Sequence, residues 1–261
     1  MNTMPLYDGY IFDLDGTLYL GEQLIEGADR TVATLRDRGA RVMFVTNKPI
    51  SSRQTYAAKL TELGIPADVE EVLTSPLALA DYIAAHHQSP NVLLLGEKPV
   101  TEELEAVGCR IVHKAEDAEI VVISWDREVT WERLDEAFQA LRGGARFYVT
   151  NPDVTCPVES GELSDAGAVV AYMQACSKRD PDHIAGKPYP ALAEVAMQRM
   201  GVTPQRTLLA GDRLQTDLKC GKNAGCATAV VLTGVSTRAD IEALPADEQP
   251  DYVLQSVVEL V

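Results

Sequence analysis

Short apolar runs alternate with helical patterns along almost the whole chain. The apolar runs predict strands, and the segments between them, where apolar residues recur every three or four positions, predict helices. We expect strands over residues 10–13, 41–46, 92–95, 120–124, 146–150, 207–210 and 228–232, and helices over residues 28–38, 51–63, 76–87, 131–142, 167–177, 190–200 and 216–224. Parallel strands are usually connected by helices. The alternation therefore predicts an α/β fold built on a doubly wound, mostly parallel sheet.

Polar residues gather where some of these strands end. Asp13 and Asp15 follow the first strand in "YIFDLDGT", Thr46 and Asn47 end the second in "VTNK", and "GDRLQTD" (211–217) follows "TLLA". Ligands of such sheets bind at the carboxyl ends of the strands, so these residues are candidates for one common site. Lys187 in "AGKPYP" is the fourth element of this set.

The middle of the chain lacks such a cluster. Between about residues 76 and 184 the strand and helix patterns continue, but no strand end carries comparable chemistry. We therefore predict two domains, a core formed by residues 1–75 and 185–261 and a smaller inserted α/β domain formed by residues 76–184. A chain of 261 residues is long enough for both.

Composition excludes several classes of protein. The net charge of −16 disfavours nucleic acid as a partner. No apolar stretch is long enough for a membrane span, and no targeting segment is visible at the start, so we expect a cytoplasmic protein without a membrane partner. Five cysteines without C-x-x-C spacing indicate neither a disulfide framework nor a zinc site.

The first acid pair is suited to phosphoryl chemistry. Asp13 at a strand end is a candidate metal ligand or covalent nucleophile, since carboxylates act as nucleophiles in phosphoryl transfer. Asp15 lies on the same side if the chain stays extended, and is a candidate general acid and then general base. Gly16 would permit a tight turn and close approach of a substrate.

The second acid pair predicts a metal site. Asp212 together with Asp13 would form an oxygen-rich site suited to Mg²⁺, with Asp217 close by. Lys187 would supply positive charge at a phosphoryl group, to which Thr46 and Asn47 would donate hydrogen bonds.

Each of these residues also has an ordinary structural interpretation. The "DLDGT" stretch is a candidate strand-to-turn junction, and Thr46 and Asn47 are candidate caps of the following helix. Lys187 would then be a solvated loop lysine, and Asp217 an acid near a helix N-terminus. The occurrence of all four elements in one chain favours the functional interpretation.

The four motifs together resemble the haloacid dehalogenase superfamily, in the branch with a type-II cap. "TNPDVTCPVESG" (150–161) and "AGKPYPALAEVAM" (185–197) resemble its NagD-like, 4-nitrophenylphosphatase-type members. The resemblance implies a Rossmann-like core with an inserted cap domain. It also implies a two-step phosphatase mechanism in which Asp13 becomes an aspartyl phosphate and Asp15 is the general acid and base.

The resemblance also assigns the ligands of the site. The phosphoryl group would be held by Thr46, Asn47 and Lys187. Mg²⁺ would be held by the side chains of Asp13 and Asp212 and the backbone carbonyl of Asp15, with Asp217 acting through water or supporting the site from outside. Dehalogenase members lack the second aspartate of the first motif, so Asp15 favours a phosphate ester as substrate.

Five residues of the inserted segment are candidates for substrate specificity, because they lie in stretches that depart from or resemble the family pattern. They are Trp125, Asp126, Asn151, Asp153 and Asp165. In the alternative interpretation Trp125 is a core anchor and Asp165 caps the helix over residues 167–177.

The sequence thus predicts a Mg²⁺-dependent phosphomonoesterase. Its substrate would be a small phosphorylated metabolite, sugar phosphates first and nucleoside monophosphates second. The alternatives are a phosphotransferase or phosphomutase and a silent phosphometabolite-binding sensor. A homodimer is possible, with the strand over residues 146–150 as a candidate for pairing across it.

Overall fold

The computed structural model describes residues 5–158 and 161–261. Two parts of the predicted segments lie outside the described residues: the first four residues of the core, and Glu159 and Ser160 of the stretch 150–161. The chain divides into two compact units. The first unit comprises the chain up to Thr46, Arg53–Leu73 and Lys187–Val261. The second comprises Asn47–Ser52 and Thr74–Gly186. The predicted domain boundaries placed residues 47–52 in the core, whereas their contacts group them with the second unit.

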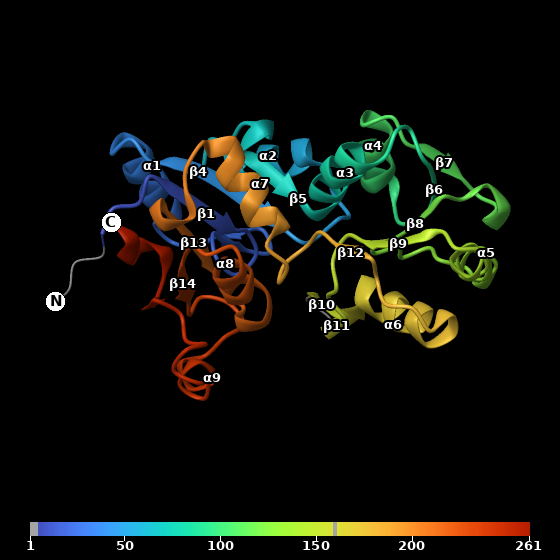
Figure 1. Cartoon of the computed structure of the whole chain (residues 1–261). Coiled ribbons are helices and arrows are strands. Elements are labelled where there is room, and N and C mark those ends of the chain that lie inside the picture. The colour runs from blue at the N-terminus through green and yellow to red at the C-terminus, as the bar shows by residue number, and fades with distance from the viewer. Residues whose placement is uncertain (1–4, 159–160) are drawn as a thin grey trace. The chain divides into compact units, whose positions relative to one another are not determined.

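The main sheet of the first unit has the strand order β15-β14-β13-β1-β4-β5, and all of these strands except β15 are labelled in Figure 1. The strands are β1 (Gly9–Asp13), β4 (Arg41–Thr46), β5 (Val72–Thr74), β13 (Thr207–Gly211), β14 (Ala227–Val231) and β15 (Tyr252–Leu254). β1 pairs in parallel with β4 on one side and β13 on the other. All five residues of β1 are buried, as expected for a central parallel strand covered on both faces.

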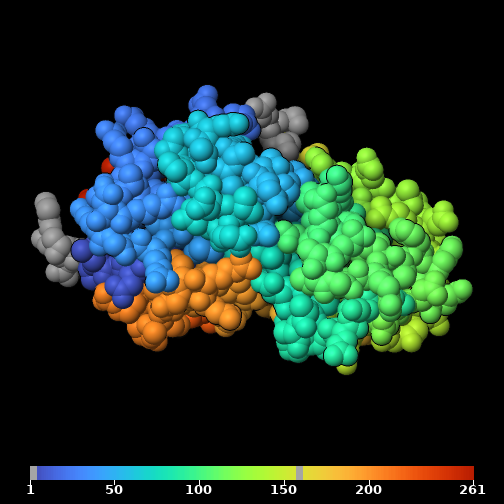
Figure 2. Space-filling model, turned by 90° about the horizontal axis from the view of Figure 1, so that it is seen from above, coloured from blue at the N-terminus to red at the C-terminus, as the bar shows by residue number. Residues whose placement is uncertain are grey.

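Helices pack against this sheet. They are α1 (Ala28–Asp37), α2 (Arg53–Glu62), α7 (Ala191–Met200), α8 (Lys219–Asn223) and α9 (Arg238–Glu242). α1 buries Ala28, Val32 and Leu35, which recur with the helical period and pack in the same cluster as Phe12 and Phe44. α7 packs on β1 and β4, and its orange surface lies beside the blue surface of the N-terminal segments in Figure 2. A short hairpin of β2 (Tyr19–Leu20) and β3 (Gln23–Leu24) follows β1.

The second unit has its own parallel sheet, with the order β12-β9-β8-β6-β7. Its strands are β6 (Asn91–Leu95), β7 (Arg110–Val112), β8 (Ile120–Ile123), β9 (Arg146–Val149) and β12 (His183–Ile184). Its helices are α3 (Ser75–His86), α4 (Lys98–Ala106), α5 (Trp131–Arg142) and α6 (Ala166–Ser177). An antiparallel hairpin of β10 (Thr155–Val158) and β11 (Gly161–Ser164) precedes α6. A separate core, which includes Ile123, Phe147 and Met173, holds this unit together.

The predicted fold class is confirmed, and the predicted strands occur within one or two residues of their expected ends. The helix expected over residues 216–224 is replaced by a wide π turn (Leu214–Leu218) followed by the short α8. A homodimer stays a prediction, but both edges of the candidate strand over residues 146–150 are occupied within its own sheet. β9 lies between β8 and β12. Beyond the two residues that pair with β12, the backbone N–H of Asp182 donates to the backbone carbonyl of Phe147 at 2.7 Å. Within residues 5–158 and 161–261, no helix has the length and apolarity needed to cross a membrane.

Candidate active site

Three carboxylates meet at the carboxyl ends of two neighbouring strands. Asp13 is the last residue of β1, and Asp212 directly follows β13, the strand paired with β1. Asp217 lies on the π turn that leads into α8. Each of the three offers a carboxylate oxygen such that these atoms lie within 4.8 Å of one another, and all three residues are buried. The parallel pairing of β1 and β13 thus brings together acids that are about 200 residues apart in the chain.

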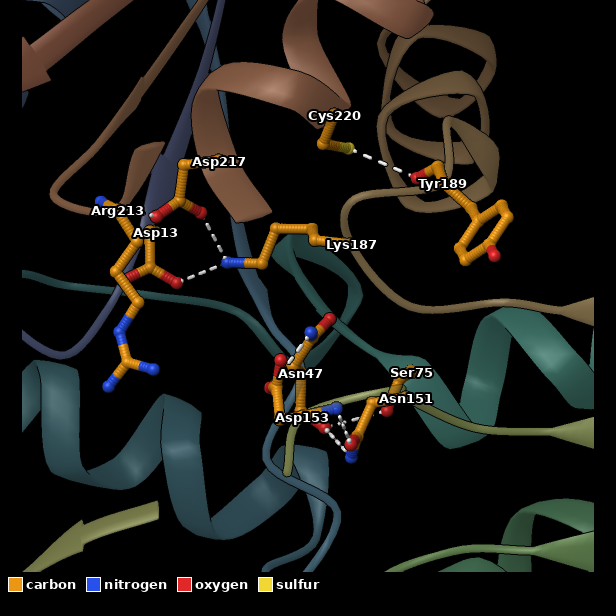
Figure 3. A network of polar contacts seen from close by, with 10 residues as sticks. All are labelled: Asp13, Asn47, Ser75, Asn151, Asp153, Lys187, Tyr189, Arg213, Asp217 and Cys220. Carbon is orange, nitrogen blue, oxygen red and sulfur yellow. Dashed lines mark hydrogen bonds and ion pairs between the residues drawn. The ribbon is translucent and has the colours of Figure 1, made fainter. Parts of the chain in front are cut away.

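Lys187 lies among these acids. Its Nζ donates a hydrogen bond to Oδ1 of Asp217 at 2.6 Å and another to Oδ1 of Asp13 (Figure 3). Lys187 is only 2% exposed, so its interpretation as a solvated loop lysine is wrong. Burial alone would lower the pKa of this ammonium, but the carboxylates of Asp13 and Asp217 outweigh burial and raise it. Lys187 therefore carries a positive charge at neutral pH.

The charge of the cluster is only partly balanced. Burial raises the pKa of Asp13 well above its ordinary value, the charges of Asp217 and Asp212 add to this, and Lys187 opposes it. Burial and the charge of Asp217 raise the pKa of Asp212 to about 6. Three carboxylates face one ammonium, so a further cation that enters the cluster would favour ionisation of Asp13 and Asp212.

Asp212 has an oxygen suited to such a cation. Its Oδ2 accepts a hydrogen bond from the backbone N–H of Val235 at 2.8 Å. Its Oδ1 is buried, and no hydrogen-bond partner for it occurs among the described residues. A buried carboxylate oxygen without a donor is costly unless a cation binds there. The donor set consists of hard oxygens, so the cluster fits a divalent metal ion.

Two glycines allow the backbone to approach Asp212. Gly16 has φ +83°, and a Cβ there would lie 2.5 Å from Oδ2 of Asp212. A Cβ on Gly234 would lie 2.0 Å from the same oxygen. The hydroxyl of Thr233 donates to the carbonyl of Gly16 at 2.6 Å. The loop after β14 therefore shapes the site together with the loop after β1.

Sequence reasoning missed this loop. Thr233, Gly234 and Val235 carry no charge and match none of the four motifs. The signal available was their position, because they follow the strand expected over residues 228–232 and thus lie at a strand end like the other candidates.

Asp15 and Thr46 occupy the same edge of the sheet. In the β1–β4 register Asp13 pairs with Val45, so Thr46 is the next residue along β4 and is buried. Asp15 is exposed, unlike the three clustered acids, and follows Asp13 in the turn that leads to β2. Because α2 begins at Arg53, neither Thr46 nor the adjacent Asn47 is its N-cap, and the capping interpretation is wrong.

The five specificity candidates lie in the second unit, and two of them have clear structural roles there. Trp125 is 4% exposed and packs with Cys156, Ala166 and Ile50. Asp126 forms an ion pair with Arg133 at 2.6 Å.

The other three candidates are linked through hydrogen bonds. Asp165 is the N-cap of α6 and accepts from the N–H of Ala166. Burial raises the pKa of Asp165 to about 6, whereas its hydrogen bond with Asn151 opposes this rise. Asp153 accepts a hydrogen bond from the side chain of Asn47 at 3.0 Å. The contribution of these residues to specificity stays a prediction.

Two family models match the chain. Residues 10–110 match the model of the haloacid dehalogenase-like hydrolases, and residues 184–260 match a model of hydrolases similar to the haloacid dehalogenases. The 5′-nucleotidase YutF of Bacillus subtilis is 37% identical over 257 residues, which cover 98% of both chains. The acid sugar phosphatase of Staphylococcus aureus is 36% identical over 239 residues, or 92% of each chain.

Solved structures agree over nearly the whole chain. The 4-nitrophenylphosphatase of Thermotoga maritima superposes with a TM-score of 0.91 at 36% identity, covering 97% of this chain and 96% of the other. The glycerol phosphate phosphatase of Mycobacterium tuberculosis in complex with magnesium gives a TM-score of 0.90 at 35% identity, covering 97% of this chain and 76% of the other.

Proposed function

The chain belongs to the haloacid dehalogenase-like hydrolases and is a phosphoric monoester hydrolase, and from this premise we propose that it is a Mg²⁺-dependent phosphatase of small metabolites. The observation that carries the proposal is the buried meeting of Asp13, Asp212 and Asp217 around Lys187. Buried acids arranged around a single cation are unfavourable for stability alone, and their presence indicates a chemical role.

Asp13 is the proposed nucleophile. One of its oxygens attacks phosphorus, the bond between phosphorus and the ester oxygen breaks, and an aspartyl phosphate forms. Water then attacks the same phosphorus, the bond to Asp13 breaks, and inorganic phosphate leaves. The hydrogen bond from Lys187 fixes the orientation of the Asp13 carboxylate for the first step.

Asp15 is the proposed proton carrier. It donates a proton to the leaving alcohol in the first step and takes one from the attacking water in the second. Asp15 is exposed, so it can exchange a proton with solvent between the two steps. Asp13 is buried and lacks this access to solvent.

Asp13 and Asp212 would hold Mg²⁺, together with the backbone carbonyl of Asp15, and Asp217 would support the site from outside. When bound, the ion supplies positive charge that stabilises the carboxylate of Asp13 and the phosphoryl oxygens. The unpartnered Oδ1 of Asp212 supports this assignment, and so does the magnesium complex of the similar glycerol phosphate phosphatase.

Thr46, Asn47 and Lys187 are the proposed phosphoryl ligands. Thr46 ends the strand next to β1, and Lys187 already contacts the nucleophile. Hydrogen bonds and one fixed positive charge would stabilise the charge on the phosphoryl oxygens in the transition state.

Sugar phosphates are the first proposed substrate class and nucleoside monophosphates the second. The similar acid sugar phosphatase and glycerol phosphate phosphatase support the first class, and the similar 5′-nucleotidase supports the second. Trp125, Asp126, Asn151, Asp153 and Asp165 remain candidates for the choice between them.

The test is phosphate release from a panel of phosphorylated metabolites and an aryl phosphate, with Mg²⁺ and with chelator. Metal-dependent release from one compound far above the rest supports the proposal and identifies the substrate. Release that is unaffected by chelator contradicts the metal requirement. Transfer of phosphate to a second hydroxyl, seen by product analysis, would replace hydrolysis with a phosphotransferase or mutase reaction.

A further inference from the structure

Asn47 is held by three side chains that are distant from it in the sequence. The hydroxyl of Ser75 donates to the backbone carbonyl of Asn47 at 2.7 Å, and Nδ2 of Asn151 donates to the same carbonyl at 3.0 Å (Figure 3). The side-chain amide of Asn47 donates to Oδ2 of Asp153 at 3.0 Å. Both the main chain and the side chain of Asn47 are therefore fixed.

Asn151 is the centre of this arrangement, which we call the Asn47 clamp (Ser75, Asn151 and Asp153). Asn151 is completely buried, and its Oδ1 accepts from the backbone N–H of Asp153 at 3.1 Å. It also forms a hydrogen bond with the carboxylate of Asp165, the N-cap of α6. An amide both donates and accepts, so an asparagine suits these contacts better than an aspartate would.

Fixing a carbonyl fixes the peptide that contains it. The peptide bond is planar, so a restrained carbonyl of Asn47 also restrains the N–H of Lys48 and the ψ angle of Asn47. Ser75 and Asn151 are fully buried, so these hydrogen bonds are formed away from solvent competition. Two buried side chains, those of Ser75 and Asn151, thus restrain the conformation of Asn47.

We propose that Asn151, assisted by Ser75, is a positioning residue for phosphate-ester hydrolysis. By fixing Asn47 it gives Thr46 and Asn47 a preformed arrangement for binding the phosphoryl group. This inference rests on the proposed function, in which both residues bind that group.

The test compares Asn151→Ala, Ser75→Ala and their double variant with the control Thr150→Val. The hydroxyl of Thr150 is buried next to Asn151 and donates to Ser124 at 2.8 Å. Its loss removes a buried hydrogen bond from the same unit without touching Asn47. The measurements are kcat and KM for an aryl phosphate, the inhibition constant of inorganic phosphate, and Tm.

We expect Asn151→Ala to raise KM and the inhibition constant of phosphate in parallel, by about tenfold, as the loss of a buried hydrogen bond allows. Ser75→Ala should raise both by about threefold, because Asn151 still holds the carbonyl. The double variant should exceed the product of the single effects, since each single variant retains one donor. Thr150→Val should lower Tm and change neither constant by more than about twofold.

Hydrogen exchange gives a second readout that a purely structural role would not change. Phosphate should slow amide exchange in the peptide covering residues 47–52 of the wild-type protein and of Thr150→Val, but not of Asn151→Ala. The proposal is overturned if folded Asn151→Ala keeps wild-type KM, phosphate inhibition and phosphate-dependent protection. A wild-type protein that neither hydrolyses the aryl phosphate nor binds phosphate would instead refute the proposed function, and this inference with it.

Discussion

Lys187 donates a hydrogen bond from Nζ to Oδ1 of Asp217 at 2.6 Å, and both side chains are almost fully buried. The same ammonium contacts Asp13, so one cation serves two acids of the cluster. Buried charges that share a partner depend strongly on one another. The activity and the stability of the protein are therefore both expected to respond to changes at these positions.

Asp13→Asn should abolish hydrolysis without unfolding the protein. The amide cannot form the aspartyl phosphate, and loss of a nucleophile lowers kcat by about 10⁴-fold or more. It also removes a buried negative charge that Asp217 and Asp212 disfavour. Asp8→Asn is the control, since Asp8 is an exposed acid paired with Arg206. Near wild-type turnover by a well-folded Asp13→Asn variant would rule out the mechanism.

Lys187→Met should lower the free energy of unfolding measured in chelator at neutral pH. Removing one partner of a buried ion pair leaves uncompensated charge and costs about 3–5 kcal/mol. Added Mg²⁺ should restore part of this loss by supplying positive charge to the remaining acids. Lys114→Met removes an exposed lysine paired with Glu136, so it should lower the free energy of unfolding far less. Equal losses in the two variants would contradict the interpretation of the buried cluster.

The sequence predicted the central strands and the acids at their ends because both signals are local. β1, β4 and β13 are nearly continuous apolar runs, and each ends at a polar residue or is followed at once by one. The contact of Lys187 with both Asp13 and Asp217 could not be predicted, since it depends on how distant segments pack. The sequence identified the lysine as a cation for the site but gave no means of identifying its partners.

Short elements escaped prediction. β5 and β7 have three residues each and β12 has two, which is too few to show a period. α4 has nine residues and buries only Val100 and Leu104, so its helical pattern is short. Tertiary packing, not local sequence, determines these elements.

Gly234→Ala should weaken metal binding. A Cβ at this position would lie 2.0 Å from Oδ2 of Asp212, so the carboxylate must move. Displacing the support of a metal ligand typically costs about 10- to 100-fold in affinity. The Mg²⁺ concentration for half-maximal activity and calorimetric titration with Mg²⁺ measure the effect. Gly143→Ala is the control, because its nearest neighbour would lie at 3.3 Å. Unchanged Mg²⁺ affinity in Gly234→Ala would argue against Asp212 as a ligand.

Thiol reagents should label Cys176 first in the native protein. Cys176 is exposed, whereas burial raises the pKa of Cys220 to about 12 and that of Cys226 to about 11. A buried thiol with a raised pKa reacts slowly, because the thiolate is the nucleophile. Cys176→Ser should abolish the fast phase of labelling at pH 7, and denaturant should expose the remaining thiols. Fast labelling of Cys220 in the native protein would contradict its packing.

His183 is a half-buried titratable group in the second unit. Its ring stacks on the ring of Tyr82 with a centroid distance of 3.6 Å. The ring of His86 also stacks on Tyr82, with a centroid distance of 4.2 Å. Nε2 of His183 is buried, and no hydrogen-bond partner for it occurs among the residues that the structure describes. Burial, with a contribution from His86, lowers the pKa of His183 to about 4, below the ordinary value of 6.5.

The contribution of His183 to the stability of the protein should therefore fall as the pH falls from about 6.5 to about 4. In this range the unfolded chain binds a proton at His183 and the folded protein does not, so acid favours unfolding. The loss should be at most about 3 kcal/mol, less where solvent reaches the ring. His183→Phe keeps an aromatic ring and should remove this contribution, whereas His113→Gln, at an exposed position, should not. Denaturant titrations at several pH values measure the difference, and equal pH slopes for wild type and His183→Phe would contradict it.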